Sequence, residues 1–282
     1  MLPSLRRLNA ADVVYSTVDT VGLPLVLLGR ASLVRQPMVY TAIGLPERLE
    51  RLRDERARGL YRSALGRASE MIAFSPFEAD MLADWLGRPV TFMPFAVDAE
   101  WFRPLPGRGA DVDAITIGAD PHRDLELFVT VAARNPELRL RAVATRDYAQ
   151  PLDSPPANVE VELDIPFAEV RDRLGSARVV ALPVKENSYS GATTVLLQAL
   201  AMGKPVVVSR TRAIETGYGL VDGENCRLVP PGDTDAFAHA LNGLLADGHA
   251  AGAMGVKARE TAESFSWGRF GDTLERILRG AA

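Results

Sequence analysis

Residues 183–210 read Pro-Val-Lys-Glu-Asn-Ser-Tyr-Ser-Gly-Ala-Thr-Thr-Val-Leu-Leu-Gln-Ala-Leu-Ala-Met-Gly-Lys-Pro-Val-Val-Val-Ser-Arg, and they predict a loop, a helix, a turn and a strand in that order. An apolar run at 179–184 predicts a buried strand that leads into the loop. Gly203 ends the helix, and three valines at 206–208 predict the next buried strand. Working outward from this unit, we expect a parallel α/β protein.

The loop before this helix is suited to an anion, because its residues are small and leave the backbone accessible: Ser190, Gly191 and Ala192. Thr193 or Thr194 can cap the helix, since a hydroxyl accepts a hydrogen bond from a first-turn amide. The free amides and the dipole at a helix start favour negative charge. Gln198 lies one turn beyond Thr194 on the same face, within reach of a sugar hydroxyl. An ordinary strand-loop-helix unit with no ligand explains the same pattern.

The segment Gln198-Ala-Leu-Ala-Met-Gly-Lys-Pro-Val-Val207 resembles the donor-binding motif of the retaining family-four glycosyltransferases, glycosyl transferases group 1. The resemblance implies an α/β protein with the GT-B fold, in which two Rossmann-like parallel-sheet domains face a cleft, here with the first domain incomplete. The two glutamates of the family motif fall on Ser190 and Gln198. The second of them holds the nucleotide ribose in the family, and the amide of Gln198 can still form hydrogen bonds there.

Composition limits the class of protein. The 282 residues are 47% hydrophobic, which allows a large core in about two domains, and the net charge of −4 argues against a nucleic-acid-binding protein. A single cysteine fits a reducing compartment, and the three histidines lack metal-ligand spacing, so we expect no metal and no cofactor. The early apolar run at 21–29 is too short to span a bilayer. We therefore expect a cytoplasmic bacterial protein, with peripheral membrane contact left open.

The amino-terminal part predicts half of a doubly wound domain. Its expected strands lie at 11–19, 38–43 and 70–75, and its expected helices at 20–30, 45–68 and 77–87. In the long helix we place Leu60, Leu65 and Ala68 on or near the buried face. Three strands leave an uncovered sheet edge. We favour a true start upstream of Met1 over a naturally short chain, because the family has further strands before this point.

Two further segments carry the resemblance. Residues 90–104 are similar to the interdomain segment of the family, residues 213–233 to its closing stretch, and residues 265–278 to its terminal motif and last helix. We therefore expect a partial acceptor-side domain with the interdomain segment at 1–104, a donor-binding domain at 105–265, and a helix at 266–282 that crosses back to the first domain.

In the second domain we expect strands at 114–118, 138–144 and 159–163, and each strand end is a candidate ligand position. The family has cations after the first of these strands that clamp the donor diphosphate, and Arg123 is the candidate here; a surface ion pair with Asp120 or Asp124 is the alternative. Asp164 and Ile165 follow the third strand on the expected base side.

Lys185 and Glu186 follow the strand that leads into the central loop. The lysine could neutralise a diphosphate and the glutamate could contact sugar hydroxyls, whereas an exposed Lys-Glu pair is the alternative. In the family a histidine of the first domain lies near the sugar, but no histidine occurs before His122. Thr17, Asp19 and Thr41, at strand ends, are the replacements we can suggest.

The sequence thus predicts a glycosyltransferase that moves a sugar from a nucleotide-diphosphate sugar to an acceptor, with retention expected from the resemblance. The acceptor can be a saccharide, a lipid or a small molecule. A partner subunit or a dimer is also compatible with the sequence. The alternative is a non-catalytic nucleotide-sugar-binding subunit that pairs with a full transferase. A phosphorylase or epimerase of the same fold fits the phosphate site but has no positive feature in this chain.

Overall fold

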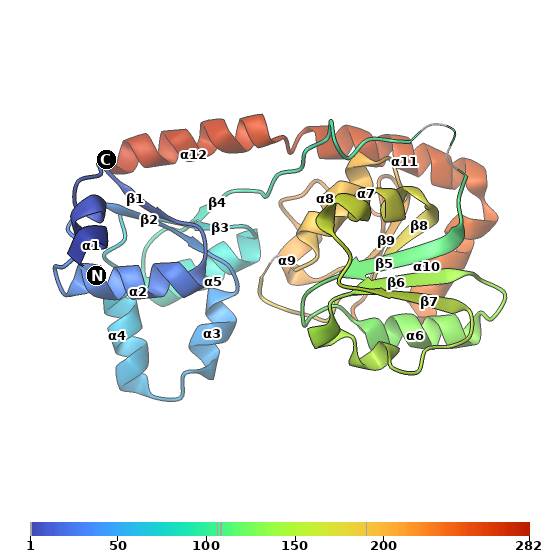
Figure 1. The fold of residues 1–282 in the computed structure, drawn as a ribbon, viewed down its shortest axis with the longest axis horizontal. Helices are drawn as coiled ribbons and strands as arrows, with labels where there is room; N and C mark the ends of the chain where they lie inside the picture. Colours follow the sequence, from blue (N-terminus) through green and yellow to red (C-terminus); the bar gives the residue numbers. More distant parts are fainter. Residues whose placement is uncertain (1, 106, 108, 190) are drawn as a thin grey trace. The chain divides into compact units, whose positions relative to one another are not determined.

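The computed structural model describes residues 2–105, 107, 109–189 and 191–282. The chain divides into two compact units (Figure 1). The first comprises Met1–Pro94, Ser188–Ser190 and Gly268–Ala282, and the second comprises Phe95–Asn187 and Gly191–Trp267. Most of the predicted interdomain segment, from Phe95 onward, therefore lies in the second unit, and the last helix lies in the first.

The first unit is built on a parallel sheet. Among the described residues its order is β1-β2-β3-β4, with bounds Val14–Ser16, Met38–Ala42, Glu70–Ala73 and Thr91–Phe92. The register places Val14 beside Met38 and Val39 beside Glu70. The three predicted strands are confirmed, and β4 adds a fourth, so β1 and β4 are the edges of this sheet.

Helices cover this sheet and enclose one apolar core that includes Val26, Tyr40, Leu65 and Leu82. The helices that contribute to this core are α1 (Leu2–Leu8), α2 (Asp19–Arg30), α3 (Leu45–Arg51), α4 (Glu55–Leu65) and α5 (Pro76–Leu86). The last helix, α12 (Trp267–Ala281), belongs to this unit from Gly268 onward and has no buried residue. The expected single helix over 45–68 is wrong, because Leu52 is extended and the Asp54 carboxylate caps a new helix by accepting from the Arg56 amide. Leu65 and Ala68 are buried as expected, whereas Leu60 is exposed.

The second unit has a larger parallel sheet. Its order over the described residues is β10-β9-β8-β5-β6-β7. In chain order the strands are β5 (Val112–Gly118), β6 (Leu140–Ala144), β7 (Val159–Leu163), β8 (Ala177–Leu182), β9 (Val206–Ser209) and β10 (Arg227–Val229). The chain builds from β5 to β7 in one direction and then returns to place β8 on the other side of β5. Ligands of open α/β sheets bind at such a reversal, beyond the carboxyl ends of the strands.

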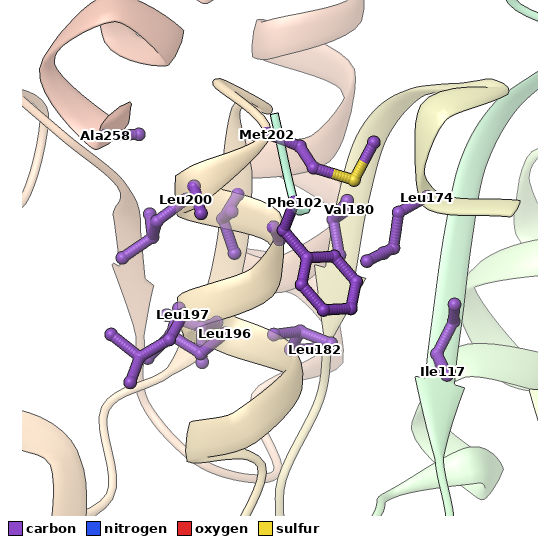
Figure 2. Packing of buried hydrophobic residues seen from close by; sticks show 14 of the residues in the cluster. Phe102, Ile117, Leu174, Val180, Leu182, Leu196, Leu197, Leu200, Met202 and Ala258 are labelled. Atoms are coloured by element: carbon purple, nitrogen blue, oxygen red, sulfur yellow. The ribbon is translucent and has the colours of Figure 1, made fainter. Parts of the chain in front are cut away.

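Two apolar layers cover the two faces of this sheet. One includes residues of α6 (Leu125–Arg134) and α10 (Thr234–Ala246); the other includes residues of α7 (Phe167–Gly175), α8 (Thr193–Ala201) and α11 (Gly248–Glu263). Short helices η1 (Arg146–Tyr148), η2 (Gln150–Leu152) and α9 (Arg212–Glu215) complete the unit. Figure 2 shows Phe102 in the second layer, beside Val180 and Leu182 of β8 and Met202 at the end of α8.

The central helix α8 begins differently from the prediction. Thr193 is already its first residue, and the capping position is Ala192, which has a left-handed backbone with φ of 69° and offers no side-chain acceptor. The expected threonine cap is therefore wrong. The helix does end before Gly203, whose φ of 65° suits a residue without a Cβ. Over the described residues, no helix is both long and apolar enough to cross a membrane.

Candidate functional site

The loops after β5 and β8 are held together at the sheet reversal. The Asp124 amide donates to the Pro183 carbonyl at 2.9 Å, and the Lys185 amide donates to the His122 carbonyl at 2.8 Å. Between these bonds Arg123 pairs with Val184 in an isolated antiparallel bridge. The two loops therefore form one structure, and Arg123 lies at the point where α/β sheets bind their ligands.

Arg123 is buried rather than on the surface. Its side chain is only 1% exposed, and its guanidinium lies 3.7 Å from the Asp120 carboxylate. The ion pair predicted as an alternative thus exists with Asp120, but it is not a surface pair; Asp124 instead caps α6 by accepting from the Leu127 amide. Gly118, the last residue of β5, leaves room for the guanidinium, since a Cβ there would overlap it.

The amino terminus of α8 contributes backbone amides to the same edge of the sheet. Gly191, Ala192 and Thr193 are all buried, whereas Thr194 is exposed. Ser190, the remaining member of the predicted anion loop, lies outside the described residues. A helix start with small buried residues has the geometry that binds phosphate oxygens.

Three buried polar atoms that lack a hydrogen-bond partner among the described residues lie after strands of this sheet or at the start of α8. Within the described part of the chain, the buried Asn187 Oδ1, Thr193 Oγ1 and Thr211 Oγ1 have no hydrogen-bond partner. They follow β8, begin α8 and follow β9, respectively. Buried polar atoms are almost always satisfied by protein, water or ligand, so each of these needs an explanation. Asn187 and Thr211 were not among the site residues predicted from the sequence, although both are polar residues that follow a buried strand.

Lys185 and Glu186 are both engaged with neighbouring residues. Lys185 Nζ lies 3.3 Å from the Glu126 carboxylate on a largely exposed surface. Glu186 Oε1 accepts from the Arg212 amide at 3.2 Å and lies 3.6 Å from the Arg212 guanidinium nitrogen Nε. Glu186 therefore fixes the loop after β8 to the start of α9, a contact that a role toward sugar hydroxyls would have to share.

Gln198 and Thr194 line a pocket of about 560 Å³ within the second unit. Its other lining residues are mostly aromatic or apolar: Phe95, Ala96, Val97, Trp101, Phe102, Phe167, Ala168 and Trp267, together with Asp98. Phe95 packs edge-on against Trp267, and the Arg171 guanidinium lies 4.1 Å from the centre of the Trp101 ring. Apolar walls with a few polar groups are typical of small-molecule sites. The predicted i, i+4 pair on α8 thus shares one cavity.

Asp164 and Ile165 lie at the end of β7. Asp164 has a φ of 54°, and its carboxylate accepts from the Arg146 amide at 3.1 Å. Ile165 packs partly buried against the apolar layer that also contains Leu196 and Leu197 of α8. The turn therefore lies on the same face of the sheet as α8.

In the first unit the suggested catalytic replacements differ in exposure. Thr17 is exposed, whereas Asp19 and Thr41 are buried. The Asp19 carboxylate accepts from the Tyr40 hydroxyl at 2.6 Å and the Ile43 amide at 3.3 Å. Burial raises the pKa of Asp19, and the bond from Tyr40 partly offsets that rise. Asp19 therefore organises the loop after β2.

A second buried carboxyl supports the same loop. Glu78 Oε1 accepts from the Gly44 amide at 2.8 Å and the Leu45 amide at 3.3 Å. Its Oε2 is buried without a partner among the described residues. Burial is the largest cause that raises the pKa of Glu78 to about 8. Over the described residues, no cluster of three or more His, Cys, Asp or Glu side chains could hold a metal ion.

Comparison with known proteins finds a matching family and several relatives. Residues 122–247 match the family described as Glycosyl transferases group 1. The D-inositol 3-phosphate glycosyltransferase of Kineococcus radiotolerans is 28% identical over 253 residues, covering 76% of this chain and 58% of that protein. A GDP-mannose-dependent phosphatidylinositol monomannoside mannosyltransferase of Mycolicibacterium smegmatis is 35% identical over 122 residues, covering 41% of this chain and 31% of that protein. The chain thus spans less than two thirds of these relatives.

Solved structures show the fold. The sucrose-phosphate synthase of Thermosynechococcus elongatus matches with a TM-score of 0.79 at 18% identity, covering 99% of this chain and 76% of that one. HepE of Anabaena, solved in complex with UDP-glucose, matches with a TM-score of 0.81 at 16% identity and covers 99% and 81%. The expected GT-B fold with two parallel-sheet domains is confirmed, and the residues that match the glycosyl transferases group 1 family lie almost wholly in the second unit.

Proposed function

We propose that the second unit binds a nucleotide-diphosphate sugar and that the protein transfers the sugar to an acceptor. The observation that carries the proposal is the position of Arg123, a buried cation bridged to Val184 at the sheet reversal. Its guanidinium and the amides at the start of α8 together offer the donors that a diphosphate requires. The family match over residues 122–247 supports this reading.

The unpartnered polar atoms extend the site toward the sugar. A hydroxyl-rich ligand beside the diphosphate would give Asn187 Oδ1 and Thr193 Oγ1 the hydrogen bonds that the described protein does not supply. Thr211 Oγ1, at the end of β9, would do the same from the neighbouring strand. These three residues are our additions to the donor-binding set predicted from the sequence.

The aromatic-lined pocket suits the nucleoside. Gln198 is buried, with a relative exposure of 4%, and it lines the cavity together with Thr194. A ribose offers two hydroxyls to an amide that both donates and accepts. The aromatic rings lining the cavity can stack on a planar base, and Asp164 and Ile165 lie at the strand end on the same face.

The reaction that we propose depends on stabilising the negative charge of the leaving diphosphate. The bond from the anomeric carbon to the diphosphate oxygen breaks, and a bond from the same carbon to the acceptor forms while the acceptor loses its proton to the departing diphosphate or to solvent. The diphosphate gains negative charge, and Arg123 with the α8 amides stabilises that charge where it develops. Retention at the anomeric carbon is proposed on the resemblance alone, and the acceptor remains open among saccharides, lipids and small molecules. The single cysteine, Cys226, supports a cytoplasmic location.

The test is calorimetric titration of the whole chain with UDP, GDP and their sugar conjugates. We expect one nucleotide to bind, and we expect Arg123→Ala and Gln198→Ala each to weaken it about tenfold or more, since each loses one strong hydrogen-bonding group. Arg134→Ala and Gln150→Ala are matched controls elsewhere in the second unit and should leave affinity unchanged. If no nucleotide binds, or if the controls weaken binding equally, the donor site is wrong.

A non-catalytic subunit is the second candidate. Asp19 and Thr41 are buried in hydrogen-bond networks of the first unit, and Glu186, a further catalytic candidate, is bound to Arg212, so these three groups already have structural roles, whereas Thr17 is exposed. A turnover assay with the nucleotide sugar that binds separates the two. Release of free nucleotide in the presence of an acceptor supports the enzyme, whereas tight binding without release supports the subunit.

A further inference from the structure

The first unit contains a pocket at the end of its sheet where the parallel strands begin. The pocket has a volume of about 360 Å³ and is lined by the end of α2, the approach to β2 and the segment between α4 and β3. Met38 is the first residue of β2, and Ser69 directly precedes β3. Since the strands are parallel, their amino-terminal ends meet here, whereas Asp19 and Thr41 lie at the carboxyl-terminal ends on the opposite side of the sheet. The pocket is therefore separate from the residues considered above.

The lining of this pocket is cationic. It includes Arg35 and Arg67 and no aspartate or glutamate. Both side chains are exposed, and neither forms an ion pair or a side-chain hydrogen bond with any residue that the structure describes. Two guanidinium groups without counter-charges in one concavity are an arrangement that attracts an anion.

Two neighbouring arginines, in contrast, form hydrogen bonds within the protein. The Arg88 guanidinium donates to the Ala68 carbonyl beyond the end of α4, and Arg30 Nε donates to the Ser63 hydroxyl. Cations near helix ends are favoured by the helix dipole, which is the plain explanation for Arg35 and Arg67. However, in the described part of the chain neither of them donates to a carbonyl. That explanation is therefore incomplete.

Hydroxyl donors add to the lining. Ser32 has a φ of 58° and occupies the left-handed position after α2, where the Leu33 amide donates to the Leu28 carbonyl at 2.9 Å. Glycine is the usual residue at such a helix end because a Cβ is disfavoured there. The chain instead keeps a serine whose side chain lines the pocket, and Ser69 brings a second hydroxyl. A strained residue at a cavity is a reason to suspect a ligand.

The charge of the unit agrees with an anionic ligand. The first unit contains fifteen arginines against twelve aspartates and glutamates, whereas the second has seventeen arginines and lysines against twenty-four acidic residues. The field of the first unit thus favours anions. We propose that the pocket binds a phosphate ester, held by Arg35 and Arg67 with hydrogen bonds from Ser32 and Ser69.

The size and the walls of the pocket narrow the ligand. A volume of about 360 Å³ exceeds that of a phosphate ion, and Val26, Val34 and Met38 give it an apolar side. An ester that carries a small organic group matches this lining better than free phosphate. Such a group can come from a free metabolite or from a phospholipid headgroup, and the chemistry of recognition is the same for both.

The experiment uses the whole chain at low ionic strength with two probes. Glycerol 1-phosphate is titrated by calorimetry, and co-sedimentation is measured with phosphatidylglycerol vesicles and with phosphatidylcholine vesicles. The variants are Arg35→Gln, Arg67→Gln and their combination. Arg53→Gln is the matched control, because Arg53 is exposed in the same unit, does not line the pocket and changes the net charge equally.

We expect each single variant to weaken binding about tenfold, since a charge-assisted bond to phosphate is lost, and the combined variant to abolish it. Binding of glycerol 1-phosphate with this pattern indicates a free ester. Binding only to phosphatidylglycerol vesicles with this pattern indicates a headgroup. The proposal is overturned if neither probe binds, if phosphatidylcholine binds equally, or if Arg53→Gln weakens binding as much. Urea unfolding of each variant checks that the first unit still folds.

Discussion

The guanidinium of Arg123 occupies the space that a Cβ on Gly118 would fill. Gly118 ends β5 at the sheet reversal, and Arg123 lies buried against it. The glycine therefore determines where the proposed diphosphate ligand finds its cation. A side chain at position 118 would therefore affect ligand binding indirectly, by displacing the Arg123 guanidinium.

We expect Gly118→Ala to weaken nucleotide-diphosphate binding about tenfold, because the Arg123 guanidinium must move away from position 118. The cost in unfolding free energy should be about 1 kcal/mol, since the overlap is with the end of a flexible side chain. Calorimetry and urea unfolding measure the two effects. Gly243→Ala, in the open interior of α10, is the control and should stabilise the fold slightly. Unchanged affinity in Gly118→Ala would contradict the role given to Arg123.

Glu78 predicts a pH dependence of stability. The folded protein raises the pKa of Glu78 from an ordinary value of 4.5 to about 8, mainly because the carboxyl is buried. Between these values the folded state holds a proton that the unfolded state has lost, so stability falls as pH rises through this window. The slope contributed by this group is at most about 1.4 kcal/mol for each pH unit.

Glu78→Gln should remove this slope, because the amide keeps the acceptor for Gly44 and cannot ionise. We therefore expect the stability of the variant relative to the wild type to rise from pH 5 to pH 9 in urea unfolding. Asp80→Asn, an exposed change on the same helix, should follow the wild-type profile. A constant difference between Glu78→Gln and wild type over this range would show that Glu78 stays ionised in the folded state.

Much of the fold could be predicted because the strands are buried apolar runs bounded by glycine, proline or polar residues. The central unit over residues 179–208 is an example, and its strand and helix lie close to the expected positions. The break at Leu52–Asp54 could not be seen, because charged residues continue evenly through it and hide the cap at Asp54. Local pattern alone does not distinguish one exposed helix from two.

The candidate site could be predicted only in part. The resemblance pointed to Arg123. The burial of the Arg123 side chain, however, depends on tertiary contacts with Gly118 and with the loop after β8, which the local sequence does not show. Asn187 and Thr211 look like ordinary loop residues in the sequence. Their significance is that no neighbouring atom satisfies them, and that depends on the packing around them.

The aromatic-lined pocket can be tested by filling it. Ala168 lines it from the first turn of α7, where its own side chain is exposed. We expect Ala168→Trp to weaken binding of a nucleoside diphosphate at least tenfold by occupying the cavity, with little change in unfolding free energy. Ala253→Trp, at an exposed position of α11, is the control. Equal nucleotide affinity in both variants would place the nucleoside elsewhere.

Arg259 secures one wall of that pocket. Its Nη1 donates to the carbonyls of Ala99 at 2.8 Å and Phe102 at 2.9 Å, and also to that of Ala201 at the end of α8. We expect Arg259→Met to cost about 2–4 kcal/mol in urea unfolding, because three carbonyls lose a charged donor while the packing volume is kept. Nucleotide affinity should fall as well, since the segment 95–102 that this arginine holds supplies lining residues. Lys257→Met removes only an exposed pair with Glu260 and should leave the unfolding free energy close to that of the wild type. Equal losses in the two variants would mean that the segment is held by its apolar contacts and not by Arg259.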